Sequence, residues 1–136
     1  MASLHEDIFI AADPAAIWDA ARDVGQLHDR LVPGFVVATE MLAGAEPPVR
    51  RVTFANGAVA DETIVSVDDA RRRLVWAIKA FDHHNGALEV AAAPGGACVT
   101  WTADLLPDAL AAQVQPMMAK GLELMKARFE DVAAGS

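Results

Sequence analysis

Residues 81–86 (FDHHNG) hold the densest group of side chains that could do chemistry in this chain, because two histidines follow an aspartate. Imidazole and carboxylate groups can bind a metal ion, exchange protons, or contact a ligand at the lip of a pocket. Asn-Gly is also a strong hairpin dipeptide. An ordinary solvated turn between two strands is therefore the alternative to a functional role.

The histidine spacing argues against a metal site. Adjacent side chains of a strand point to opposite faces, so His83 and His84 cannot easily bind one ion. His5 and His28 are isolated, and neither an HxH nor an HExxH pattern occurs. We expect no metal and no other cofactor.

No established catalytic set is visible. The chain has no GxSxG, phosphate loop or dinucleotide fingerprint, and it has no tyrosine. Its one cysteine, Cys98, is expected to be a small packed residue in a strand. If the protein is an enzyme, Glu62 and His83 are the candidates for acid and base. The residues alone leave catalysis undecided.

Length and charge limit the class of protein. The 136 residues are enough for one domain, spanning 1–136, and the net charge of −8 argues against binding nucleic acid. No run of about 18 apolar residues occurs, so membrane insertion is not expected. The first ten residues lack the basic and apolar regions of a secretion signal. A cytoplasmic location is the resulting expectation.

The elements that would position these residues follow a clear order. Residues 4–10 alternate as a first strand, and Asp13 before Pro14 predicts a helix that ends at Gly25. A second short helix is expected over 26–31, and a long apolar-striped one over 108–133, broken or kinked at Pro116. Turn residues separate six further strands, which form an antiparallel sheet: 35–42, 49–55, 59–67, 73–81, 87–93 and 97–106.

Three segments in this order resemble the START-like (SRPBCC) superfamily with its helix-grip fold. They are residues 8–27 (IFIAADPAAIWDAARDVGQL), residues 49–78 (VRRVTFANGAVADETIVSVDDARRRLVWAI) and residues 95–107 (GGACVTWTADLLP). The most similar branch is that of the polyketide cyclase/dehydrase proteins. Plant abscisic acid receptors resemble the chain more distantly, with a gate loop at residues 56–58 and a histidine-bearing latch at 82–85. The gate is shorter here and lacks the receptors' proline, so no hormone receptor is predicted.

The resemblance implies an α+β fold in which a seven-stranded curved antiparallel sheet wraps around one long C-terminal helix. Two short helices follow the first strand, and a cavity separates sheet and helix. It also implies that a small hydrophobic molecule, such as a lipid or a polyketide, binds there. The family's cyclases use arginine and tyrosine side chains.

Strand alternation selects the residues that would face this cavity. Glu62 shares a face with Ile64 and, by resemblance, matches a pocket glutamate; the opposite phase would leave it in solvent. A carboxylate in an apolar cavity needs a donor, and Arg51 is the nearest candidate. Ser66, Leu74, Val99, Ala103 and Leu105 are expected on the same inward face. The predicted ligand-binding residues are Ala60, Glu62, Ile64, Trp76, Ile78, His83, Leu88, Val90, Trp101, Met118, Leu122 and Met125.

Three functions are compatible with these residues. The first is a carrier or sensor of a small hydrophobic ligand, as in lipid transport. The second is a polyketide cyclase/dehydratase-like enzyme acting on such a ligand in the same cavity. The third is an interaction module whose groove binds a partner protein. The sequence does not name the ligand or the pathway, and it leaves a homodimer open.

Overall fold

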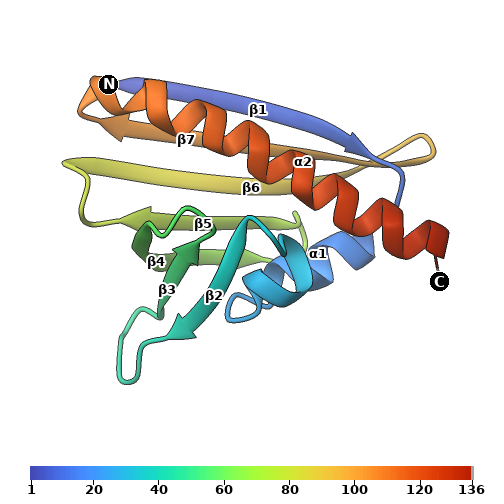
Figure 1. Ribbon diagram of the computed structural model, residues 1–136, viewed down its shortest axis with the longest axis horizontal. Helices are drawn as coiled ribbons and strands as arrows, with labels where there is room; N and C mark the ends of the chain where they lie inside the picture. Colours follow the sequence, from blue (N-terminus) through green and yellow to red (C-terminus); the bar gives the residue numbers. More distant parts are fainter. Residues whose placement is uncertain (136) are drawn as a thin grey trace.

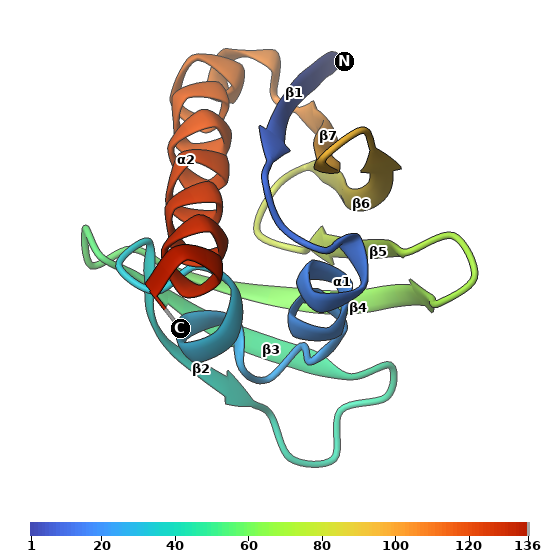
Figure 2. The ribbon, with the colours of Figure 1, turned by 90° about the vertical axis from the view of Figure 1, so that its right-hand side faces the viewer.

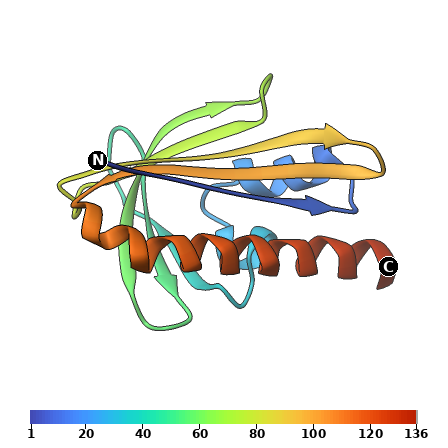
Figure 3. The same ribbon diagram turned by 90° about the horizontal axis from the view of Figure 1, so that it is seen from above.

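A seven-stranded antiparallel sheet curves around the long C-terminal helix in the computed structural model, which describes residues 1–135 and side chains through residue 132. The strand order across the sheet is β1-β7-β6-β5-β4-β3-β2. β1 and β7 run along helix α2, whereas β2 and β3 turn across the molecule (Figures 1 and 3). The strands are β1 (Ala2–Ile10), β2 (Val36–Met41), β3 (Val49–Phe54), β4 (Val59–Asp68), β5 (Arg73–Ile78), β6 (His83–Ala93) and β7 (Gly96–Leu106). The predicted fold class is confirmed.

The first helix begins where the sequence predicts. The Asp13 side chain accepts a hydrogen bond from Ala15 N at 2.9 Å, and Pro14 opens helix α1 (Pro14–Arg22). The helix ends at Arg22, three residues before the predicted Gly25. A single π-helical turn, η1 (Leu27–Leu31), forms the second short helix. Both pack inside the curve of the sheet (Figure 2).

The C-terminal helix is preceded by a 3₁₀ turn, η2 (Asp108–Leu110), and α2 spans Ala111–Gly135. The predicted break at Pro116 was wrong, because the helix continues through it. Pro116 lies in the second turn, where its missing N–H removes only the bond to the carbonyl of Ala112. Ala112 is exposed, so water can satisfy that carbonyl.

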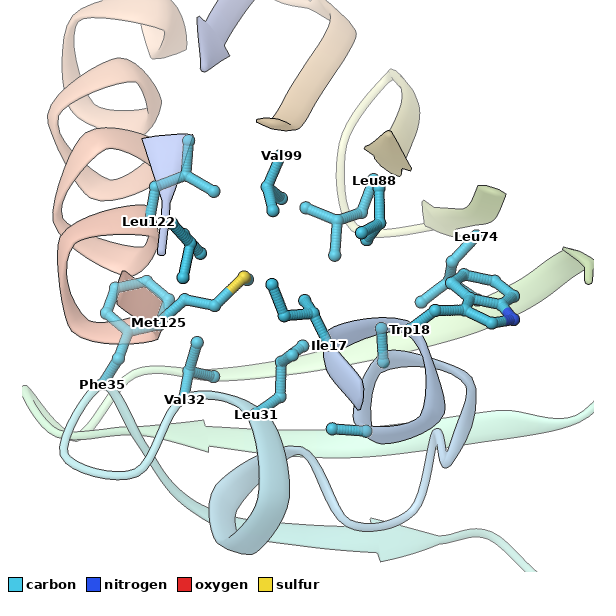
Figure 4. Packing of buried hydrophobic residues seen from close by; sticks show 14 of the residues in the cluster. Ile17, Trp18, Leu31, Val32, Phe35, Leu74, Leu88, Val99, Leu122 and Met125 are labelled. Carbon is cyan, nitrogen blue, oxygen red and sulfur yellow. The ribbon is translucent and has the colours of Figure 1, made fainter. Parts of the chain in front are cut away.

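The core lies between α2, α1 and the concave face of the sheet. Leu122 and Met125 of α2 point toward Ile17 of α1 in Figure 4. Met118, one turn earlier in α2, packs in a second cluster with Leu4 and strand β7. The predicted apolar stripe of α2 is thus buried in its middle. Its last member, Val132, is 49% exposed.

The stretch FDHHNG divides between turn and strand: residues 81–82 lie in the turn and residues 83–86 in the strand. β6 begins at His83, four residues earlier than predicted, and the chain reverses over residues 79–82. Asn85 and Gly86 therefore pair with β7 inside the sheet, and the interpretation of residues 83–86 as a hairpin turn was wrong. Gly86 serves close packing instead, because a Cβ there would lie 2.9 Å from Trp76 Cε2.

Candidate functional site

A cavity of about 340 Å³ lies between the concave face of the sheet, η1 and α2. Its volume is at the small end of the range for pockets that hold small organic molecules. Most of its wall is apolar, and Arg50 and Glu62 are its only charged residues in the part of the chain that the structure describes. The cavity therefore has the character of a site for a mainly apolar molecule.

Seven of the predicted ligand-binding residues line this cavity: Ala60, Glu62, Trp76, Ile78, Leu88, Trp101 and Met125. Four others are buried in the packed core instead: Ile64, Val90, Met118 and Leu122. Strand alternation identified the inward face correctly for those that lie in strands, and helical spacing did so for Met118, Leu122 and Met125 of α2. Neither pattern could show where side chains of the helices would fill the space behind this face.

Aromatic side chains from distant parts of the chain form much of the wall. The Trp76 and Trp101 rings lie 5.8 Å apart, and the Phe35 and Phe54 rings meet edge-on at 5.4 Å. Gly121 lets α2 approach this wall, because a Cβ there would lie 2.9 Å from Trp101 Cζ3 and 3.0 Å from Phe35 Cε2. The helix thus closes the cavity against two aromatic rings.

A buried ion pair supplies the charged groups of the cavity. Arg50 pairs with Glu62 in the register between β3 and β4, and Arg50 Nε donates to Glu62 Oε1 at 2.8 Å. Both residues are almost fully buried. Arg50 Nη1 also donates to the carbonyl of Val24 at 3.4 Å, and its guanidinium carbon lies 5.7 Å from the centre of the Trp76 ring. The predicted inward position of Glu62 is what the structure has.

The predicted partner of Glu62 was wrong. Arg51 points to the opposite face of β3 and pairs with the exposed Asp61 at 2.8 and 3.0 Å. The reason is the two-residue period of a strand, which places Arg50 with Glu62 and Arg51 with Asp61. A β-bulge between Ile64 and Ser66 makes a second correction, because it shifts the phase and leaves Ser66 exposed.

His84, rather than His83, faces the cavity. The early start of β6 places His84 on the inward face with Gly86 and Leu88, and His83 is exposed. The His84 ring packs edge-on to Phe81 at 5.1 Å. Burial, and then the nearby charge of His83, lower the pKa of His84 to about 4, so its imidazole is neutral at pH 7.

The loop between β3 and β4 forms one edge of the cavity through Asn56 and Ala58. Asn56 Oδ1 accepts a hydrogen bond from Ala58 N at 3.0 Å, and Gly57 has a φ of +89°, so the turn is tight. These residues occupy the position that matches the gate loop of the abscisic acid receptors, and no receptor-like gating is predicted for them.

Strand alternation does not identify the wall residues that come from η1, its flanking loop and the first turns of α2. They are Leu27, Leu31, Val32, Phe35, Gln113, Val114 and Met117. Helical spacing does connect Gln113 and Met117 with Met125, and that signal was available. The η1 residues carried no such signal, because a five-residue segment is too short to show a period.

The described part of the chain has neither a metal-binding cluster nor a membrane-spanning helix. No group of three or more histidine, cysteine, aspartate or glutamate side chains there could hold a metal ion. None of its helices combines the length and the apolar character needed to cross a membrane.

The curved sheet, the long helix and the cavity between them define a START-like (SRPBCC) protein with the helix-grip fold. The chain belongs to the family described as polyketide cyclase/dehydrase and lipid transport, whose model matches residues 1–130. No curated protein matches the chain.

Solved structures share the fold over nearly the whole chain. Protein XoxI from Bacillus cereus is 17% identical with a TM-score of 0.83, covering 98% of this chain and 99% of that one. A protein from Thermobifida fusca is 26% identical with a TM-score of 0.75, covering 95% and 93%. Norcoclaurine synthase from Thalictrum flavum, in complex with dopamine and hydroxybenzaldehyde, is 16% identical with a TM-score of 0.67, covering 98% and 87%.

Proposed function

We propose that the protein binds a small hydrophobic molecule in the cavity between the sheet and α2, as a carrier or sensor. The observation that carries this proposal is an open cavity of about 340 Å³ with a mainly apolar wall. A molecule that enters an apolar cavity gains packing contacts with its wall and is removed from water, and both effects favour binding.

The polar groups of the cavity support a binding role. Arg50 and Glu62 neutralise each other, so the cavity can hold an apolar molecule without leaving an isolated charge beside it. The family description includes lipid transport, and norcoclaurine synthase, which shares the fold, has been solved with two small aromatic molecules. Both are consistent with an internal ligand in this chain.

The alternative is a cyclase- or dehydratase-like enzyme that acts on such a molecule in the same cavity. A specific observation favours it, because a carboxylate (Glu62) and a neutral imidazole (His84) line one apolar space. These groups could accept and return a proton. His84 takes the place that the sequence assigned to His83.

Native mass spectrometry of the protein purified from its own host tests the binding proposal. We expect a co-purified molecule that is released on denaturation. The variant Ala60→Phe should lose it, since residue 60 lines the cavity and the larger ring would fill the space. Val65→Phe is the matched control, because Val65 lies on the same strand and is 55% exposed.

The outcome separates the candidates. A molecule retained by the control and lost from Ala60→Phe supports the cavity as the binding site. Recovery of the same molecule unchanged after incubation supports a carrier or sensor, and a product that has lost water or closed a ring supports an enzyme. Absence of any co-purified molecule, together with no uptake of a neutral hydrophobic dye, would reject both. A cytoplasmic location and a homodimer stay predictions.

A further inference from the structure

We propose that His84 is a second polar recognition point of the cavity, and that the cavity selects uncharged molecules with an oxygen group at each end. The proposal rests on the proposed function and deepens it by naming the chemical class of the ligand. Three observations carry it: the position of His84 in the sheet, the atoms left open at each end, and the charge balance of the wall.

His84 and the ion pair occupy one row across the sheet. The register aligns Arg50 with Glu62 and Glu62 with Ile78. Trp76 pairs with Gly86, so His84 lies in the row of Ile78, on the next strand. Strands are spaced about 4.8 Å apart, which places the backbones at Glu62 and His84 roughly 10 Å apart or more, since β5 ends at Ile78. Apolar Ile78 lies between the two polar points.

At the first polar point, the Arg50–Glu62 ion pair, one donor atom and one acceptor atom are available to a ligand. Arg50 uses Nε for Glu62 and Nη1 for Val24, and the carboxylate accepts through Oε1. Among the described residues, no group forms a hydrogen bond with Arg50 Nη2 or with Glu62 Oε2. Neither atom is fully buried, so both remain accessible. A hydroxyl group can accept from the first and donate to the second, so it fits this point.

At the second point, the buried imidazole offers one N–H. His84 Nδ1 is the one buried side-chain nitrogen or oxygen in the described part of the chain that has no hydrogen-bond partner. A proton on Nδ1 would be an unsatisfied buried donor, so the neutral ring carries its proton on Nε2. The Nε2–H group can donate to a hydroxyl or carbonyl oxygen of a ligand.

The wall has no charge left for an ionised ligand. Arg50 and Glu62 cancel, His84 is neutral at pH 7, and no other charged side chain described in the structure lines the cavity. A carboxylate ligand at the His84 end would be buried without a counterion, which is costly. A fatty acid anion is therefore a poor fit, and a neutral ring system with oxygen groups is a good one.

A probe series tests this selection. The probes are biphenyl, para-phenylphenol, para,para′-biphenol and the analogue of biphenol with one hydroxyl replaced by carboxylate. Binding is followed by isothermal titration, with quenching of Trp76 and Trp101 fluorescence as a second readout. Each hydroxyl should strengthen binding about fivefold, because one hydrogen bond contributes roughly 1 kcal/mol and 1.4 kcal/mol is tenfold. The carboxylate analogue should bind at least about tenfold more weakly than biphenol.

The variant His84→Phe isolates the second point, because it keeps an aromatic ring beside Phe81 and removes both nitrogens. Biphenol should then bind no better than para-phenylphenol binds the parent protein, a loss of about fivefold. Binding of para-phenylphenol itself should be unchanged, since its one hydroxyl occupies the ion-pair point. His83→Phe is the matched control and should leave the whole series unchanged, because His83 is exposed and lies off the cavity wall.

The results separate this proposal from the proposed function. Equal binding of all four probes, tighter binding of the carboxylate, or an equal loss for both phenols in His84→Phe would overturn the two-point selection while leaving a binding cavity. Failure of all probes beside a co-purified native ligand would also overturn the selection alone. Failure of the probes with no native ligand would overturn both.

Discussion

Two neighbouring ion pairs in the same strand ladder show how strongly the face of a sheet governs the role of a charge. Arg50–Glu62 and Arg51–Asp61 have the same Nε–oxygen distance of 2.8 Å. The side chains of the first pair are 3% and 7% exposed, and those of the second are 46% and 45% exposed. Two pairs with the same Nε–oxygen distance therefore differ in solvation.

That difference sets what each pair can do. Charges removed from water pay a desolvation cost, so Arg50 and Glu62 depend on each other. The guanidinium of Arg51 donates two hydrogen bonds that hold the pKa of Asp61 below its usual range, yet water competes for both groups. The buried pair can serve as a polar anchor in an apolar cavity, whereas the exposed pair cannot.

Breaking the buried pair should have the largest effect on stability. Glu62→Gln leaves the Arg50 guanidinium buried without its counterion, so we expect the free energy of unfolding to fall by about 3–5 kcal/mol. Arg50→Met leaves the Glu62 carboxylate buried without its counterion, so the free energy of unfolding should fall by a similar amount. Urea denaturation at pH 7 measures both, and an unchanged midpoint would show that water reaches the pair.

The double variant Arg50→Met/Glu62→Leu is the control that separates pairing from packing. It removes both charges and retains apolar volume, so its stability should lie near that of the parent protein. Its affinity for a hydroxyl-bearing ligand should fall nonetheless. If the double variant is as unstable as the two single variants, the loss of stability comes from altered packing and not from the unpaired charge.

Acid should lower the free energy of unfolding through the protonation of His84, which lies on the buried face of the sheet. Its pKa is about 4 in the folded protein and about 6.5 when unfolded, so between these values the unfolded chain binds the extra proton. The contribution of the neutral His84 side chain to the free energy of unfolding is fully present above about pH 6.5, and it is lost as the pH falls toward 4. The loss from pH 7 to pH 5 should be about 2 kcal/mol, measured by urea denaturation.

His84→Phe is the control for this pH dependence, since it removes the titrating group and retains a buried ring. Its stability should decline less steeply between pH 7 and 5, with the remaining slope due to other groups. A parallel decline in both proteins would assign the acid sensitivity to groups other than His84.

Breaking the exposed pair should have the smallest effect. Asp61→Asn removes the charge partner of Arg51, but both side chains are already in contact with water, and we expect a melting temperature close to that of the parent protein. Any small change should shrink in high salt, because ions screen exposed charges. A loss as large as that of Glu62→Gln would contradict the distinction between the two faces.

The fold and the inward position of Glu62 could be predicted from patterns in the sequence together with the resemblance to helix-grip proteins. The patterns that predict the elements are local: period-two alternation, the Asp13-Pro14 helix start and the apolar stripe of the last helix. Each depends only on residues that are close in sequence, so it can be recognised before the tertiary contacts are known. The resemblance to helix-grip proteins predicts that these elements surround a cavity. Trp76 and Trp101 lie on its wall for the same reason.

The arginine that pairs with Glu62 and the histidine that faces the cavity could not be predicted from the sequence, because both depend on how the strands pair. The register of β3 against β4 selected Arg50, and the extension of β6 back to His83 turned His84 inward. A bulge after Ile64 turned Ser66 out. Register, strand length and bulges depend on contacts between segments distant in sequence, and a shift of one residue exchanges the two faces of a strand.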